Sequence, residues 1–204
     1  MRALRCRVTA ILLSLIFAPC GVACGVEDVF LPSHPDLSPD GKTMVFAWRG
    51  DLWTVASTGG RARRLTSHPG REQMPKFSPD GKRIAFIGDR GLGNKAYVMP
   101  AAGGEPTALT AHTEGYTLEA WYPDGEHLLV GGRRDHYWRR PDRFFQIRAD
   151  KPGGEQLVFD DYGAEGAVSP DGKRVLFVRE GVSWPRKGYV GSQDAQIWLY
   201  DTTA

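Results

Sequence analysis

Short apolar runs separated by turn residues recur along residues 26–204, and no segment has a sustained helical period. The first run of each unit lies at residues 44–46, 84–86, 128–130 and 175–177. A second run follows each of them, at residues 52–55, 96–99, 144–147 and 197–200. Continuous apolar runs of this length are typical of strands that are buried on both faces. The pattern therefore predicts an all-β protein.

The tripeptide Pro-Asp-Gly precedes each first run, and its four aspartates lie 40, 44 and 47 residues apart. Proline presets the first corner of a turn, aspartate bonds to its own backbone two residues on, and glycine accepts a positive φ. We predict structural turns at Asp40, Gly41, Asp80, Gly81, Asp124, Gly125, Asp171 and Gly172.

Paired glycines at residues 59–60, 103–104 and 153–154 suit tight hairpins after the second runs. Outer strands are predicted after them, at residues 63–66, 107–110 and 156–159, and a short strand is predicted before each Pro-Asp-Gly, as at residues 74–77. Four strands in a repeat of this length are typical of a β-propeller blade. Residues 24–204 therefore form a propeller segment, with blades at roughly residues 28–66, 67–110, 111–159 and 160–204.

The fourth blade is expected to be incomplete, because residues 160–204 contain no outer strand. One alternative is that the chain is a segment of a larger propeller. The other is that residues 26–31 supply the missing strand and close a ring of four blades. An open arc would have two exposed sheet edges, and we expect it to associate in solution.

Residues 1–23 resemble a signal peptide. Arg2, Arg5 and Arg7 precede an apolar stretch at residues 8–18, which is too short to span a membrane. Without this leader, which has three arginines and no acid, 23 basic and 24 acidic residues remain, a net charge of −1 instead of +2. The sequence therefore favours an exported protein, periplasmic or secreted, with no affinity for nucleic acid from its overall charge.

All three cysteines lie within the first 24 residues, so the predicted propeller has no disulfide framework. Cys24 follows Gly21, Val22 and Ala23, a loose version of a lipoprotein cleavage box, and a lipid anchor at Cys24 is an alternative to simple cleavage. No later run is long and apolar enough for a transmembrane helix.

Two segments resemble tricorn-type peptidases. The first is Asp-Leu-Trp-Thr-Val at residues 51–55, followed by Gly59-Gly60 and by Arg-Leu-Thr at residues 64–66. The second is the basic, glycine-rich stretch at residues 184–198, which is similar to an insertion in that family's fourth blade. The Pro-Asp-Gly repeat alone also resembles TolB and the propellers of prolyl-oligopeptidase-like enzymes.

The tricorn resemblance implies a six-bladed N-terminal propeller. In that family a second propeller, a PDZ domain and a serine-peptidase domain follow, and the propellers line routes for short peptides. The family's catalytic residues map onto no position of this sequence. Its paired arginines, which hold a peptide carboxylate, would fall within residues 112–122, where this chain has no arginine. The expected function is a non-catalytic gate or docking scaffold; a TolB-like periplasmic binding protein is the alternative.

Two basic insertions are the candidate contact surface for peptide ends, for further domains of a longer peptidase or for other envelope proteins. Arginine binds carboxylates with two parallel hydrogen bonds and stacks on aromatic rings. The candidate residues are Arg133, Arg134, Arg139 and Arg140 in the third blade, and Arg186 and Lys187 in the fourth.

Catalytic, metal and cofactor sites are not expected. Ser192 lacks the Gly-x-Ser-x-Gly context of a nucleophile elbow. His68 and His112 each follow a Leu-Thr pair, so we expect them to repeat one structural contact in successive blades rather than surround one metal ion.

Overall fold

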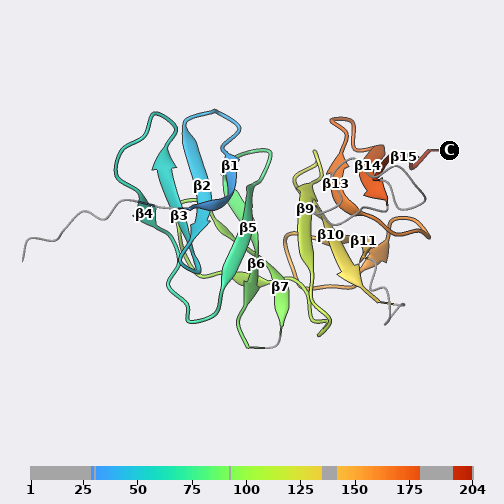
Figure 1. Cartoon of the computed structure of the whole chain (residues 1–204), viewed down its shortest axis with the longest axis horizontal. Helices are drawn as coiled ribbons and strands as arrows, with labels where there is room; N and C mark the ends of the chain where they lie inside the picture. The colour runs from blue at the N-terminus through green and yellow to red at the C-terminus, as the bar shows by residue number, and fades with distance from the viewer. Residues whose placement is uncertain (1–28, 30, 92, 135–141, 180–194, 204) are drawn as a thin grey trace, which may run out of the picture.

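The computed structural model describes residue 29 and residues 31–91, 93–134, 142–179 and 195–203. The predicted leader, Cys24 and Ser192 lie outside this part. Every regular element within it is a β-strand, and the strands form four antiparallel sheets (Figure 1). The all-β propeller architecture is confirmed.

Each sheet is one blade, and its strands follow one another in chain order. Blade 1 contains β1 (Ser33–Leu37), β2 (Thr43–Trp48), β3 (Asp51–Ala56) and β4 (Arg63–Arg64). Blade 2 contains β5 (Glu72–Phe77), β6 (Arg83–Asp89), β7 (Asn94–Pro100) and β8 (Thr107–Ala108). Blade 3 contains β9 (Thr117–Trp121), β10 (His127–Arg133), β11 (Asp142–Arg148) and β12 (Gln156–Leu157). Blade 4 contains β13 (Ala164–Val168), β14 (Arg174–Arg179) and β15 (Gln196–Asp201).

Successive blades pack through their inner strands: β1 contacts β5, β5 contacts β9, and β9 contacts β13. The described strands of blade 1 have no contact with those of blade 4, so the four blades form an open arc rather than a closed ring (Figure 1). Two carboxylates link neighbouring inner strands. Asp36 accepts a hydrogen bond from the Phe77 amide at 2.7 Å, and Glu119 accepts one from the Gly166 amide at 2.9 Å.

The core consists of the interfaces between blades. We call the side of a blade that meets the next one its forward face, and the opposite side its backward face. Val45 on β2, Ala85 on β6 and Leu129 on β10 share one register position on the forward face, and all three are fully buried. Backward-face side chains such as Phe86 and Val130 cover them. Alternation along each strand therefore supplies two apolar faces, as the continuous runs predict.

The Pro-Asp-Gly turns are closed by a repeated side-chain network. Ser78 donates its hydroxyl proton to Asp80 at 2.6 Å, and its oxygen accepts the Arg83 amide at 2.9 Å. Asp80 also accepts the Lys82 amide at 3.1 Å, and these hydrogen bonds lower the pKa of Asp80. Blades 1 and 4 have the same network around Asp40 and Asp171.

Blade 3 closes its turn differently, because Tyr122 stands where the other blades have serine. His127 takes over the role of the missing hydroxyl, and its Nδ1 lies 2.7 Å from Asp124 Oδ2. Partial burial raises the pKa of Asp124, but hydrogen bonds from His127 and from two backbone amides outweigh it and lower the pKa overall. All four aspartates therefore close their turns as predicted, three with a serine hydroxyl and one with a histidine side chain.

The outer strands are shorter than predicted, with two residues each instead of four. Beyond β4, Thr66 Oγ1 accepts the Leu52 amide at 2.9 Å, and beyond β8, Thr110 Oγ1 accepts the Ala96 amide at 3.0 Å. In blades 1 and 2 a threonine side chain thus takes the place of a backbone acceptor, and the ladder ends early there.

The two histidines repeat one contact, as predicted. His68 Nδ1 accepts the Gly70 amide at 2.9 Å, and His112 Nδ1 accepts the Glu114 amide at 3.2 Å. Each imidazole closes the loop that leads to the next inner strand.

Candidate functional site

The connections between the second and third strands of each blade lie on one face of the arc, and the Pro-Asp-Gly turns lie on the opposite face. We call the first of these the insertion face; Arg133 at the end of β10 and Arg179 at the end of β14 lie there. Arg139, Arg140, Arg186 and Lys187 lie outside the described residues. Arg133 and Arg134 are described, and the structure gives them different surroundings.

Arg134 is held in a compact cluster. Its guanidinium pairs with Glu155 at 2.9 Å and lies over the rings of Tyr116 and Phe145, with its carbon 4.8 and 4.9 Å from the ring centroids. The Tyr116 hydroxyl also donates to Glu155. Burial raises the pKa of Glu155, so the nearby cation offsets the cost of an ionised carboxylate there. Arg134 thereby joins the residue before β9, the strand β11 and the loop before β12.

Arg133 is far more accessible. Its side chain is 51% exposed, and its partner Asp142 lies 3.4 Å away on the neighbouring strand. The two residues line a groove of about 120 Å³ together with Tyr116, Thr117 and Glu114. Burial raises the pKa of Asp142, the first residue of β11. A guanidinium with this exposure can turn toward an incoming carboxylate without breaking a buried ion pair.

Arginines held like Arg134 recur around the arc. Arg90 follows β6, pairs with Glu72 at 2.5 Å and lies over Tyr97 at 5.2 Å. Arg179 ends β14, pairs with Asp161 at 2.9 Å and lies over Trp198 at 5.1 Å. Arg90, Glu72 and Arg179 were not among the site residues predicted from the sequence. The sequence did contain a signal for these arginines, because an arginine lies at or next to the end of the second strand in every blade.

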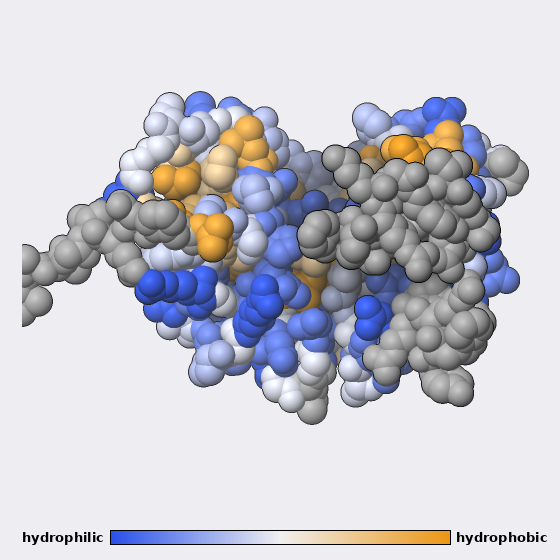
Figure 2. Space-filling model, viewed as in Figure 1, coloured by the Kyte–Doolittle hydropathy of each residue, from blue (hydrophilic) through white to orange (hydrophobic). Residues whose placement is uncertain are grey.

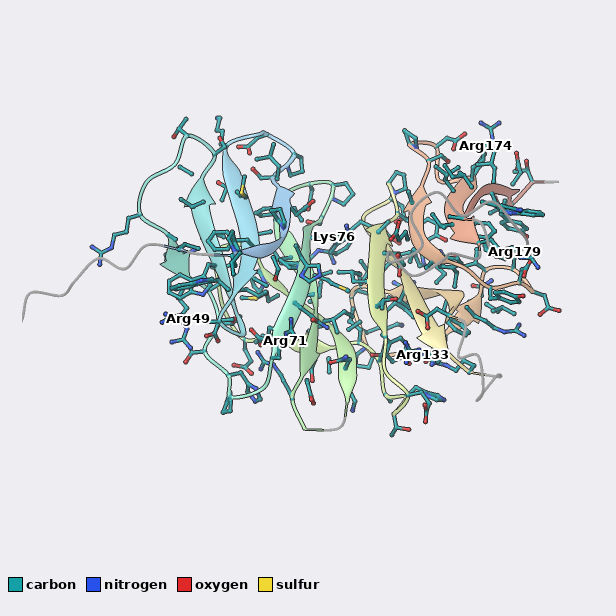
Figure 3. All side chains as sticks on the ribbon, in the orientation of Figure 1. Arg49, Arg71, Lys76, Arg133, Arg174 and Arg179 are labelled. Carbon is teal, nitrogen blue, oxygen red and sulfur yellow. The ribbon has the colours of Figure 1, made fainter. Side chains whose placement is uncertain are left out.

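Basic side chains gather on the insertion face of blades 1 to 3. Figure 3 labels Arg49, Arg71 and Arg133 along the lower side of the arc, and Figure 2 shows hydrophilic surface there. Arg49 lies over the Trp48 ring at 4.7 Å, and Arg71 is exposed. Arg174 lies on the opposite side, at the turn end of blade 4. The insertion face of this open arc thus presents accessible guanidinium groups beside carboxylates.

This architecture defines a β-propeller, and the comparisons with known proteins identify its kind. A family model of the tricorn protease N-terminal beta propeller domain matches residues 30–204. The chain therefore belongs to this family.

Tricorn protease homolog 1 of Streptomyces coelicolor is 28% identical over 166 residues, which are 79% of this chain and 15% of that protein. The crystal structure of the tricorn protease matches 84% of this chain and 17% of its own, with a TM-score of 0.65 and 22% identity. TolB from Acinetobacter baumannii matches 85% of this chain and 41% of its own, with a TM-score of 0.66 and 18% identity. The chain thus spans about a sixth of the tricorn proteins it resembles.

Metal sites and membrane-spanning helices are both absent from the described residues. No group of three or more histidine, cysteine, aspartate or glutamate side chains in this part is arranged to hold a metal ion. Nor does the same part contain a helix with the length and hydropathy needed to cross a membrane.

Proposed function

We propose that this chain is a non-catalytic propeller segment of an exported tricorn-like serine peptidase, and that its insertion face docks peptides or the other domains of that enzyme. The family match over residues 30–204 carries the proposal. The small share of the full-length relatives that the chain covers supports a role as one part of a larger enzyme. The leader at residues 1–23 supports export.

The docking surface in this proposal is centred on Arg133. Its exposed guanidinium lies at the mouth of the groove beside Asp142, where an incoming carboxylate competes with a long, exposed ion pair. Arg134, already paired and stacked, positions the neighbouring strands and so fixes the direction from which a ligand approaches Arg133. The basic residues Arg139, Arg140, Arg186 and Lys187 extend the same surface in this proposal.

Arg133→Ser tests the docking role against a matched control. The probes are tetra-alanine with a free carboxyl terminus and its amidated form. Arg174→Ser is the control, because Arg174 is 53% exposed, pairs with Asp201 at 3.2 Å and lies at the turn end. We expect Arg133→Ser to weaken binding of the free-carboxyl peptide about threefold or more, while the variant stays folded at the assay temperature. Equal binding by the two variants would reject this surface.

Absence of catalysis is tested separately. We expect the purified chain to hydrolyse no peptide substrate. Turnover that disappears in Ser192→Ala would overturn the non-catalytic assignment.

A second candidate is a TolB-like binding protein with no link to proteolysis, which the fold match to TolB favours. Affinity capture from the producing cells distinguishes the two candidates. Recovery of the chain as part of a peptidase supports the first, and recovery with separate envelope proteins supports the second.

A further inference from the structure

The first and third junctions between blades have equivalent grooves on the turn side of the arc. Each groove lies between the Pro-Asp-Gly turns of two successive blades and is flanked by the outer strand of the first. The groove between blades 1 and 2 has a volume of about 400 Å³, and the groove between blades 3 and 4 one of about 450 Å³. The last junction differs from the first two in the residues at two equivalent positions.

The first two junctions each contain an arginine of the chain itself. Arg63, on β4, lines the groove between blades 1 and 2 beside Asp40 and Asp80, and donates to the Ala102 carbonyl at 3.2 Å. Arg83 crosses from blade 2 to blade 3, donates to the Gly125 carbonyl at 2.5 Å and lies over the Trp121 ring at 5.1 Å.

The third junction lacks an arginine at both positions. Strand pairing places Gln156 where blade 1 has Arg63, because Arg63 pairs with Thr54 and Gln156 with Gln146, the equivalent residues of β3 and β11. His127 takes the place of Arg83 and bonds to Asp124 within its own turn. No arginine, lysine or histidine is among the residues that line this groove. They are Tyr122, Pro123, Asp124, Gln146, Gln156, Leu157, Val158, Asp171, Gly172, Tyr200 and Thr202.

The groove nevertheless keeps the pair of turn aspartates that lies beside Arg63 in the groove between blades 1 and 2. Asp124 and Asp171 flank it, and the side-chain amides of Gln146 and Gln156 line it. Tyr122 also lines it, and only 6% of the surface of this residue is exposed. No residue in the described part of the chain hydrogen-bonds to the Tyr122 hydroxyl. The ring of Tyr122 is thus buried, and its hydroxyl, which is accessible from the groove, can accept a hydrogen bond from a ligand or from water.

We propose that the groove between blades 3 and 4 binds the guanidinium group of an arginine side chain in a peptide. The chain's own Arg63 and Arg83 are internal examples of the arrangement. A bound guanidinium would be flanked by the two turn aspartates, would donate to the amide oxygens and the Tyr122 hydroxyl, and would place its flat face near the tyrosine rings. A neutral side chain of the same shape would gain no attraction from the two carboxylates, so the site selects for charge.

This site is independent of the docking surface around Arg133. That surface lies on the insertion face and is proposed to bind a carboxylate, whereas this groove lies on the turn side and is proposed to bind a cation. Failure of one proposal therefore leaves the other standing.

The test is an NMR titration of the ¹⁵N-labelled full chain with N-acetyl-arginine amide and its neutral isostere N-acetyl-citrulline amide. We expect the arginine probe to bind with a dissociation constant on the order of 1 mM and to shift the side-chain amides of Gln146 and Gln156. The citrulline probe is expected to bind at least about tenfold more weakly. Equal binding of both probes, or shifts confined to other regions, would overturn the proposal.

Two substitutions at equivalent positions sharpen the test. Gln156→Arg supplies the groove with a guanidinium of its own and should abolish binding of the arginine probe. Thr107→Arg makes the same change at the equivalent exposed position of β8, where Arg83 already occupies the junction, and should leave binding unchanged. Tyr122→Phe removes the hydroxyl without changing the ring and should weaken binding about threefold to tenfold. Undiminished binding by Gln156→Arg would contradict the proposal even if the other variants behave as expected.

Discussion

Alanine substitution of two leucines at the same register position tests how the blades are stabilised. Leu129 lies on the forward face of blade 3, is fully buried, and packs in a cluster with Val175 and Phe177 of blade 4. Leu176 holds the equivalent position on blade 4 and is 45% exposed. Leu129→Ala should lower the free energy of unfolding by about 2–5 kcal/mol, because it removes buried methyl groups and leaves a cavity. Leu176→Ala should cost about 1 kcal/mol or less, because much of its side chain already contacts solvent.

The difference reflects the whole forward face of blade 4. Ile197 on β15 is 75% exposed, whereas Leu52, at the same register position on β3, is fully buried. Figure 2 shows hydrophobic surface over β14 and β15. Blades 1 to 3 each have a following blade on this face, and within the described chain blade 4 has none.

The assay is urea unfolding followed by tryptophan fluorescence, at concentrations where the midpoint does not depend on protein concentration. With a urea m-value of about 2 kcal/mol/M, Leu129→Ala should lower the midpoint by about 1 M or more, and Leu176→Ala by about 0.5 M or less. Equal losses from the two substitutions would refute the reasoning, because they would mean that the forward face of blade 4 is covered as fully as that of blade 3.

Three further predictions concern single side chains. Ser78→Ala should lower the free energy of unfolding by about 1–2 kcal/mol at neutral pH, because it removes two hydrogen bonds of the buried Ser78 hydroxyl. The pKa of Asp80 is lowered in the folded state, so its stabilising contribution is present above its ordinary pKa of 3.8 and is lost as the pH falls through the folded value; the cost of Ser78→Ala should therefore shrink in acid unfolding measurements. Arg134→Ala should cost about 1–3 kcal/mol in chemical unfolding, because Glu155 loses its cation in a partly buried place. Burial raises the pKa of Tyr122 to about 12, so stability should fall as the pH rises from about 10 through 12, and Tyr122→Phe should reduce that loss in alkaline melting curves.

Strand positions and turns were predictable from the sequence because both depend on local chemistry. A continuous apolar run such as residues 84–86 suits a strand that is buried on both faces, as it is here. The Pro-Asp-Gly turn closes through hydrogen bonds between residues that are at most five positions apart in the chain. The length of the outer strands was not predictable, because the Thr66 hydroxyl replaces a ladder bond only when the chain turns away after β4.

The backbone conformation of the inner strands was also beyond sequence reasoning. His34, Met74 and Glu165 lie at equivalent positions with φ of 51°, 54° and 55°, where the register of blades 1, 2 and 4 shifts by one residue. Left-handed backbone is unfavourable for such residues, and here it coincides with the β-bulge in each inner strand. No residue type marks it in advance.

For the candidate site, the sequence located the basic cluster but could not sort its members. Arg133 and Arg134 are neighbours in the chain, yet one is exposed and the other lies between two rings and a carboxylate. Tyr116 and Glu155, which create that difference, come from loops far away in the sequence.

The size of the native polypeptide tests the central claim most directly. An antibody against residues 31–91 would be used on the producing cells, and the reactive band identified by intact mass. If the chain is the propeller segment of a tricorn-like peptidase, the antibody will detect a polypeptide several times longer than 204 residues. A product of 204 residues or fewer, with no longer species at any stage of growth, would contradict the account.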